Sequence, residues 1–307
     1  MSRNLLILGA APSLGELRDT LIRLEDTIIF ALIERSQFKQ NHDIYEAGKM
    51  SFNDGYQGSF LSWFLREVEC VHARVRRYQS PDEYAFTDNL PEPILPPLEY
   101  PPVLVDPKAI NINDEILDVY VNTVVPGIAT KGDDSNYGSS ATRDIECLQA
   151  LSRRIHYGKF VAESKFQDPH THDEYVRHIK DKNRDKLMEL LTNARVEELL
   201  LKRLKAKAII YGQDLSAAST DANGATNGFA NGSANGTKNG TTNGSANGTT
   251  NGATNGSNSL LAAALASSDC VKTRVDYDLV VSLYRDYVIP LTKEVEVEYL
   301  LHRLDQK

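Results

Sequence analysis

The chain has 307 residues, of which 41% are hydrophobic and 25% are charged, proportions typical of a globular protein with one large domain or two small ones. Its net charge of −8 argues against nucleic acid as a partner, because nucleic-acid binders usually carry a strong basic excess. No stretch reaches the roughly 18 apolar residues of a membrane span, so we expect no membrane partner and a cytoplasmic location. The three cysteines lie far apart and outside any metal-binding spacing, which predicts reduced thiols and no metal site.

Helical periodicity dominates the sequence and predicts an all-α protein built as a helical bundle. Apolar residues recur at steps of three and four through 14–31 and again through 61–78, which predicts two long amphipathic helices. The eight prolines of 80–112 then predict an extended connection across the surface. No segment shows a convincing alternation of apolar and polar residues, the pattern that favours a strand.

Later helical patterns cover 113–125, 140–167, 172–212 and 276–304. We expect the first of these to end near Pro126 and the third to hold two or three helices. Pro290 lies inside the last pattern, where a proline removes a backbone donor and clashes with the preceding turn. The pattern therefore predicts either a kinked helix or two helices, the second with Pro290 in its first turn.

One low-complexity segment interrupts these patterns. In 216–258 the pair Asn-Gly recurs about every four residues, and nothing in the segment can form a core. We expect a disordered insertion, taken with its flank as 216–268, within a single domain of 1–307. Several NGS and NGT triplets match the glycosylation acceptor pattern, but without a secretory signal we interpret them as accidents of the repeat.

The helix expected over 140–167 carries two cations on one stripe. Arg154 and Lys165 are eleven residues apart, which makes just over three whole turns at about 100° per residue. Gly158 and Val161 lie between them on that stripe, so no long polar side chain separates the two cations. The rise between the cations is about 16 Å. Their side chains must therefore lean toward each other if they hold one ligand.

Other helices place polar residues in pairs on one face. Asn193 and Glu197 are four residues apart, and so are Thr292 and Glu296. Arg18 lies beside the apolar stripe of the first helix. The alternative for each pair is a solvated helix face with surface ion pairs, because charged side chains are mostly exposed.

The segment EVEVEYLL, which contains Glu296, alternates acids with valines. Helix winding must turn at least one of its glutamates toward the apolar side, where an unpaired carboxylate has a raised pKa. Together these groups predict a cationic site with an amide, a hydroxyl and a protonated carboxylic acid. Such a site suits a small dianion in the core of a helix bundle, but the residues alone name no reaction.

Long blocks of the sequence carry a more specific signal: RLEDTIIFALIERSQF (23–38), GSFLSWFL (58–65), RVRRYQSPDE (74–83), GSSATRDIECLQALSRRIHYGKFVAESKF (138–166) and VIPLTKEVEVEYLLHRL (288–304). In content and order they resemble the yeast-type, allosteric, all-helical chorismate mutases, over nearly the whole chain. The resemblance implies a homodimer that converts chorismate to prephenate on the branch to phenylalanine and tyrosine. It also implies that no cofactor or metal is needed, and that tyrosine inhibits and tryptophan activates.

The resemblance assigns a role to each polar residue singled out above. It implies that Arg18 and Arg154 bind the carboxylates of chorismate, and that Lys165 donates to the ether oxygen whose bond breaks. Glu296 matches the glutamate that must be protonated to donate to the same oxygen. Glu197 matches the acid that holds the ring hydroxyl of the substrate. Asn193 and Thr292 match the polar neighbours of that acid.

The effector site implied by the resemblance lies between subunits and holds tyrosine or tryptophan. Gly138, Ser139 and Thr142 come from one subunit, at the start of a helix whose free N–H groups can bind a carboxylate. Arg76 and Arg77 come from the other subunit. The alternatives are a solvated basic face for the two arginines and simple N-capping for Ser139 and its neighbour.

Simpler interpretations remain for some residues and for the whole chain. Arg154 has the alternative of an ion pair with Glu197 or Asp144, and Arg153 beside it is expected to be structural. Asp276 stands where the resemblance implies a threonine, and we expect its charge to weaken the response to one effector. The competing interpretation of the chain is a non-catalytic helical sensor of amino acids or an interaction protein, which the complete set of site residues disfavours.

Overall fold

The computed structural model describes residues 12–100, 102–105, 110–212 and 275–305, and every regular element in these ranges is helical. The all-α prediction is therefore confirmed for this part of the chain. The Asn-Gly insertion predicted over 216–268 lies outside the described residues. The α-helices are α1 (Leu14–Arg35), α2 (Phe60–Arg74), α3 (Asn113–Val119), α4 (Val125–Ile128), α5 (Tyr137–His156), α6 (Gly158–Phe166), α7 (His172–Lys180), α8 (Arg184–Leu191), α9 (Ala194–Gly212), α11 (Tyr277–Leu283) and α12 (Ile289–His302). Shorter turns are the 3₁₀ helices η2 (His42–Ile44) and η3 (Arg77–Gln79) and the π-helices η4 (Tyr120–Val124) and η6 (Tyr284–Val288).

The first helix begins at a capping box and follows the predicted stripe. The Ser13 hydroxyl accepts from the backbone N–H of Glu16 at 3.3 Å, and the Glu16 carboxylate accepts from the Ser13 N–H at 3.0 Å. The reciprocal bonds satisfy two donors that a helix start would leave unpaired. From there α1 buries Leu17, Leu24 and Ile28 of its predicted apolar stripe, while Leu14 at its start is exposed.

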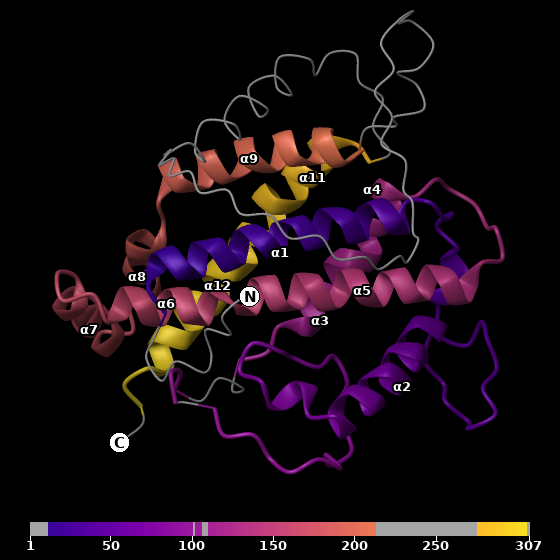
Figure 1. Ribbon diagram of the computed structural model, residues 1–307, viewed down its shortest axis with the longest axis horizontal. Helices are drawn as coiled ribbons and strands as arrows, with labels where there is room; N and C mark the ends of the chain where they lie inside the picture. The colour runs from indigo at the N-terminus through magenta and orange to yellow at the C-terminus, as the bar shows by residue number, and fades with distance from the viewer. Residues whose placement is uncertain (1–11, 101, 106–109, 213–274, 306–307) are drawn as a thin grey trace, which may run out of the picture.

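Two predicted helices have different bounds in the structure. The second ends at Arg74, short of the predicted 61–78, because Arg76 takes a left-handed backbone with φ of 70° and a 3₁₀ turn follows. The helix predicted over 140–167 divides at Tyr157 into α5 and α6. Tyr157 keeps a right-handed helical backbone, so the two helices run on in line (Figure 1) and share one stripe.

Both prolines inside helical patterns are preceded by a π-turn. The pattern expected to end near Pro126 continues through η4 and that proline and ends two residues later at Ile128, in agreement with the prediction. Pro290 lies in the first turn of α12, as the second alternative for that pattern expected, with η6 in front of it. A proline cannot donate to the preceding turn and its ring clashes there, and one wider turn relieves both problems.

The helices pack in layers around α1 and the line of α5 and α6 (Figure 1). Helix α1 lies along α5, α9 lies above α1 and packs against it and α11, and α2 packs on the far side of α5. Helix α12 runs against α6 and α8, so the C-terminal helix closes the end of the bundle that holds α7 and α8. Two clusters of buried apolar side chains result, one under α1, α2 and α5 and one between α6, α7, α8 and α12.

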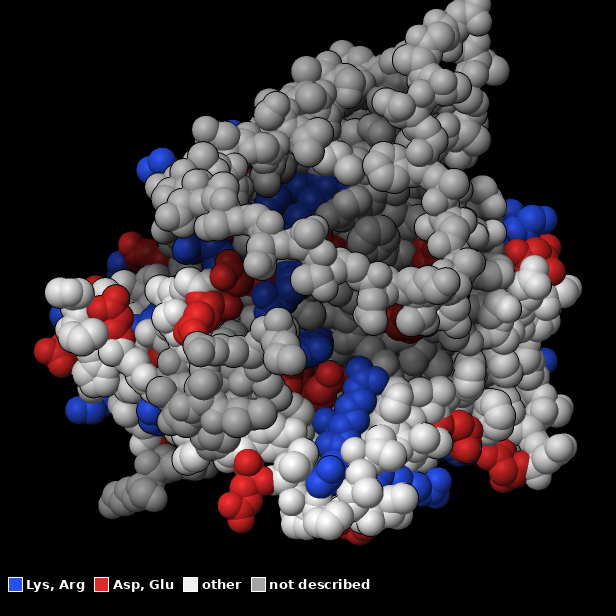
Figure 2. All heavy atoms as spheres, viewed as in Figure 1, with Lys and Arg blue, Asp and Glu red and all other residues white. Residues whose placement is uncertain are grey.

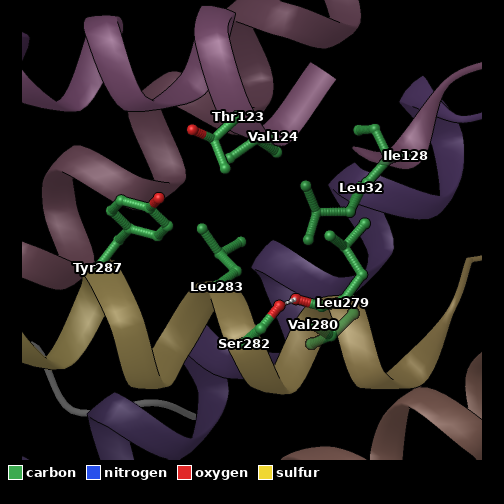
Figure 3. A pocket seen from close by; sticks show the side chains of 9 residues that line it. All are labelled: Leu32, Thr123, Val124, Ile128, Leu279, Val280, Ser282, Leu283 and Tyr287. Atoms are coloured by element: carbon green, nitrogen blue, oxygen red, sulfur yellow. Dashed lines mark hydrogen bonds between the residues drawn. The ribbon is translucent and has the colours of Figure 1, made fainter. Parts of the chain in front are cut away.

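A small apolar cavity of about 20 Å³ lies where the two π-turns meet the core (Figure 3). Thr123 comes from η4, Tyr287 from η6, Leu32 from α1, and Leu279 and Leu283 from α11. Its volume matches little more than a single water molecule. The cavity is therefore a packing gap beside the irregular turns, too small for a substrate.

A fully buried ion pair ties α1 to α5. The guanidinium Nε of Arg35 lies 2.6 Å from Asp144 Oδ1, and neither side chain is exposed to solvent. Arg35 also donates to three backbone carbonyls of 38–40 and to the Tyr45 hydroxyl. Asp144 in turn accepts from Tyr45 at 2.8 Å and from Tyr120 at 2.7 Å. The pair thus holds α1, α5, η4 and the segment after α1 in one arrangement.

Replacing Arg35 by methionine should lower the free energy of unfolding by about 3–5 kcal/mol, because Asp144 would be left buried without its cation. Urea unfolding measures the loss. The matched control is Arg143→Met, which removes an exposed ion pair with Glu146 at 2.8 Å and should cost less than about 1 kcal/mol. Equal losses in the two variants would contradict the structural role given to Arg35.

Candidate active site

A cavity of about 540 Å³ opens between α1, the junction of α5 and α6, the start of α9, and α12. Its volume is that of a typical small-molecule site. The structure brings all seven substrate-contact residues predicted from the sequence to its wall: Arg18, Arg154, Lys165, Asn193, Glu197, Thr292 and Glu296. Five helices, α1, α5, α6, α9 and α12, supply six of them, and Asn193 directly precedes α9, which explains why no short motif in the sequence marks the site.

Positive charge exceeds negative charge along the cavity wall. The wall holds the five cations Arg18, Arg154, Lys165, Arg203 and Lys293 and the three carboxylates Glu25, Glu197 and Glu296. Figure 2 shows Lys and Arg side chains in the recess between α9 and α1. In a chain with a net charge of −8, this local excess of cations favours an anionic ligand.

Each carboxylate on the wall already has a cation. The distances are 2.7 Å from Arg203 to Glu25, 2.7 Å from Lys293 to Glu197, and 3.5 Å from Lys165 to Glu296. Arg18 and Arg154 remain, and neither has a carboxylate partner among the described residues. The site thus presents two guanidinium groups that no described carboxylate neutralises.

Arg154 is the more informative of the two because it is only 4% exposed. Its Nη1 donates to the Thr292 hydroxyl at 3.4 Å, and its Nε is buried with no hydrogen-bond partner. The alternative of an ion pair with Asp144 or Glu197 was wrong, since these acids are bound by Arg35 and Lys293. A buried cation normally has a counter-ion, so Arg154 indicates the position of an anionic ligand group.

Glu296 is also buried, at 6% exposure, on the face of α12 that meets α6. Burial raises the pKa of this carboxyl group above its ordinary value, although Lys165 opposes the shift. The Lys165 ammonium donates to the Leu191 carbonyl at 2.8 Å, and Glu296 Oε2 has no hydrogen-bond partner among the described residues. Protonated, Glu296 offers an O–H donor beside the Lys165 donor.

Gly158 explains why small residues separate the two cations. A methyl group built on Gly158 would lie 2.9 Å from the Thr292 carbonyl oxygen and 3.1 Å from Glu296 Cγ. Only glycine lets the backbone of α12 approach so closely, and this approach brings Thr292 and Glu296 to the same wall as Arg154.

The remaining polar residues have local roles as well. Asn193 accepts from the Val196 N–H at 3.2 Å in the first turn of α9, and the Thr292 hydroxyl donates to the Val288 carbonyl at 2.6 Å. Arg203 and Lys293 were missed in the sequence. In the sequence, a cation beside acids on a helix is typical of a solvated helix face. No local signal could show that Arg203 and Lys293 pair with acids on other helices. Arg153 pairs with Asp82 at 2.6 Å, outside the cavity.

The predicted effector residues form two groups that are separate within one chain. Gly138, Ser139 and Thr142 lie in the first turns of α5, where Asn136 occupies the N-cap position, so the N-capping alternative for the serines was wrong. The Arg77 side chain, from η3, reaches a later part of α5, where it donates to Gln149 at 2.9 Å. Gln149 is twelve residues from Tyr137 at the start of α5, about 18 Å of helix.

Intramolecular partners hold the two arginines predicted to bind the effector. Arg76 donates to the Pro96 carbonyl, and Arg77 lies 3.1 Å from Glu83. Asp276, the departure noted in the sequence, caps α11 by accepting from the Asp278 N–H at 2.9 Å. Its carboxylate therefore has a structural role that a threonine hydroxyl could also serve.

Among the residues that the structure describes, no three His, Cys, Asp or Glu side chains gather as metal ligands would. Within the same ranges, no helix combines the length and apolar character needed to cross a membrane.

Comparisons with known proteins give one consistent family. A family model described as chorismate mutase type II matches residues 136–222. The chorismate mutase of Schizosaccharomyces pombe is 43% identical over 297 residues, which cover 95% of this chain and 96% of the relative. The chorismate mutase Aro7p of Candida albicans, solved in complex with L-Trp, superposes with a TM-score of 0.76 at 37% identity, covering 96% of this chain and 93% of that one. The chorismate mutase AtCM1, solved with tyrosine bound in its allosteric site, superposes with a TM-score of 0.72 at 39% identity, covering 96% of this chain and 98% of that one.

Gly158→Ala should lower the free energy of unfolding by about 1–3 kcal/mol, because the added methyl group would push α12 away from α6. The control is Gly138→Ala, where an added methyl group meets nothing within 4 Å. That helical position should gain up to about 1 kcal/mol from the better helix propensity of alanine. Urea unfolding of both variants measures these changes in the free energy of unfolding. A Gly158→Ala variant more stable than the parent protein would refute the close approach of α12 to α6.

Proposed function

Since this chain belongs to the type II chorismate mutases, we propose that the cavity between α1, α6, α9 and α12 is the place where it rearranges chorismate to prephenate. The enzyme is an isomerase of aromatic amino acid biosynthesis. Its reaction breaks the ether bond of chorismate and forms a carbon–carbon bond in one pericyclic step. The protein therefore needs to select a compact conformer and stabilise developing charge, with no covalent intermediate.

The observation that carries this assignment is the pair of arginines without described carboxylate partners. Chorismate has two carboxylates, and Arg18 and Arg154 offer two guanidinium groups on one wall of the cavity. Charge-assisted hydrogen bonds from arginine to carboxylate are strong and directional. Holding both ends of the flexible dianion at fixed positions favours the chair-like conformer that reacts.

Lys165 and Glu296 are the donors for the ether oxygen. Negative charge grows on this oxygen as its bond stretches, so donors already aimed at it stabilise the transition state more than the ground state. Burial favours the protonated form of Glu296, the form able to donate. Each such donor is worth about 3–4 kcal/mol of barrier in comparable sites.

Glu197 accepts from the ring hydroxyl in this account, with Asn193 and Thr292 as its polar neighbours. All three line the same cavity. Because the hydroxyl lies away from the breaking bond, these contacts fix the ring in both ground and transition states and act mainly on substrate affinity.

Tyrosine and tryptophan are the proposed effectors, tyrosine as inhibitor and tryptophan as activator. Support comes from the bound L-Trp and tyrosine of the two similar structures. In this chain, Gly138, Ser139 and Thr142 open α5 and Arg154 lies in its last turn, so one rigid helix spans both sites. An effector that shifts α5 would move the carboxylate-binding arginine directly.

A homodimer would bring Arg76 and Arg77 of one subunit to the start of α5 in the other. Exposed apolar side chains surround these arginines: Val71, Val75, Ile94, Leu95 and Leu98, which are between 41% and 75% exposed. The Ile94 N–H donates to the Arg74 carbonyl and the Leu98 N–H donates to the Gln79 side-chain oxygen, which places the 94–98 segment beside the end of α2. Such an apolar patch suits burial against a second copy of the chain.

The purified protein should consume chorismate, followed by its ultraviolet absorbance, and Arg154→Met should lower kcat/KM by about 100- to 1,000-fold, as expected for loss of a charged donor in a buried site. Arg177→Met, at an arginine side chain that is 64% exposed, serves as the control and should leave kcat/KM unchanged. The same assay with tyrosine or tryptophan added tests regulation. No turnover from a folded dimer would instead support the amino-acid sensor.

The pH profile tests the role of Glu296. Its pKa is raised by burial, and the protonated form donates, so kcat/KM should be full at low pH and fall as pH rises through the raised pKa. Glu296→Gln carries a permanent donor and should flatten this fall. If the variant and the parent enzyme lose activity over the same pH range, another group must control the profile.

A further inference from the structure

Lys293 reaches across the cavity from α12 to α9. Its ammonium lies 2.7 Å from Glu197 Oε1, and the two side chains are only 19% and 29% exposed. Both residues line the cavity. The residue next to Glu197 offers a comparison, because Glu198 pairs with Lys202 on the same helix at 2.6 Å with both side chains more than 60% exposed. The Lys293 pair therefore differs from an ordinary surface pair in joining two helices at the cavity wall.

The pair leaves one oxygen of Glu197 available. Lys293 contacts Oε1, and no hydrogen bond to Oε2 is seen within the described part of the chain. Without the ammonium, Glu197 would be free to swing toward solvent at the start of α9. Its charge would also repel a dianionic ligand that binds a few ångströms away.

We propose that Lys293 is a positioning residue that holds Glu197 in the orientation in which it accepts the ring hydroxyl of chorismate. The inference rests on the role proposed for Glu197 above. Lys293 fixes Oε1, Oε2 accepts from the hydroxyl, and the ammonium offsets the carboxylate charge as the dianion enters. Since the hydroxyl contact acts on both ground and transition states, loss of Lys293 raises KM and leaves kcat nearly unchanged.

The chief alternative gives Lys293 a contact of its own with a substrate carboxylate. Both accounts predict weaker substrate binding when the ammonium is removed. They differ in how this loss depends on Glu197, which a double-mutant cycle measures directly.

The experiment compares kcat and KM for chorismate in Lys293→Met, Glu197→Gln and the double variant. Lys293→Met should raise KM by about 10-fold or more, the effect of losing a hydrogen bond to a charged group, and should change kcat by less than about threefold. In the Glu197→Gln background the same substitution should have almost no further effect. Lys293→Arg keeps a cation on a long side chain and should restore most of the affinity.

Two controls distinguish a positioning role of Lys293 from a role in folding. Lys202→Met removes the neighbouring exposed pair with Glu198 and should leave both constants unchanged. Thermal unfolding checks that Lys293→Met is folded, and Lys293→Gln replaces it in the cycle if it is not.

Three outcomes would overturn the proposal. Additive losses in the double variant would assign Lys293 a direct substrate contact, and an unchanged KM in Lys293→Met would make the pair a surface feature. If Glu197→Gln itself leaves KM unchanged, the role proposed for Glu197 fails together with the inference. If Glu197→Gln raises KM and Lys293→Met does not, only the inference on Lys293 fails.

Discussion

The arrangement of this enzyme depends on a buried guanidinium group that no carboxylate of the described chain neutralises. Arg154 is nearly inaccessible, yet its only hydrogen bond among the described residues goes to the Thr292 hydroxyl, and its guanidinium carbon lies 6.0 Å from the centre of the Tyr284 ring. Burying a charge in this way is costly unless a counter-ion arrives, so the fold is arranged to receive an anion. The other carboxylates near the cavity are bound to Lys293, Lys165 and Arg203, which keeps them from filling that role.

The same constraint explains how the helices are packed. Arg154 must lie at the end of α5 while Thr292 and Glu296 approach from α12, and Gly158 makes this approach possible. At the other end of α5, the Arg35–Asp144 pair fixes the helix against α1. A helix anchored in this way can carry a displacement from the proposed effector site to Arg154, since it moves as one body.

Part of the fold and of the candidate site could be predicted from the sequence, because helical period and long blocks that resemble a known family can be read from the chain itself. The spacing of Arg154 and Lys165 correctly predicted that both side chains face one site, and the seven residues selected by the resemblance all line the cavity. The π-turns before Pro126 and Pro290, the break at Tyr157 and the partners of Lys293 and Arg203 were not predictable. They depend on contacts between helices distant in sequence, and such contacts leave no periodic pattern.

The most direct test of the account is the number of protons taken up when prephenate binds. Calorimetric titrations at pH 8, in two buffers with different ionisation enthalpies, measure this number. If Arg154 and its neighbours receive a dianion beside a protonated Glu296, binding should take up protons in the parent enzyme and take up none in Glu296→Gln. Equal uptake in the two proteins, or no uptake in either, would contradict the coupling of anion binding to the protonation of Glu296.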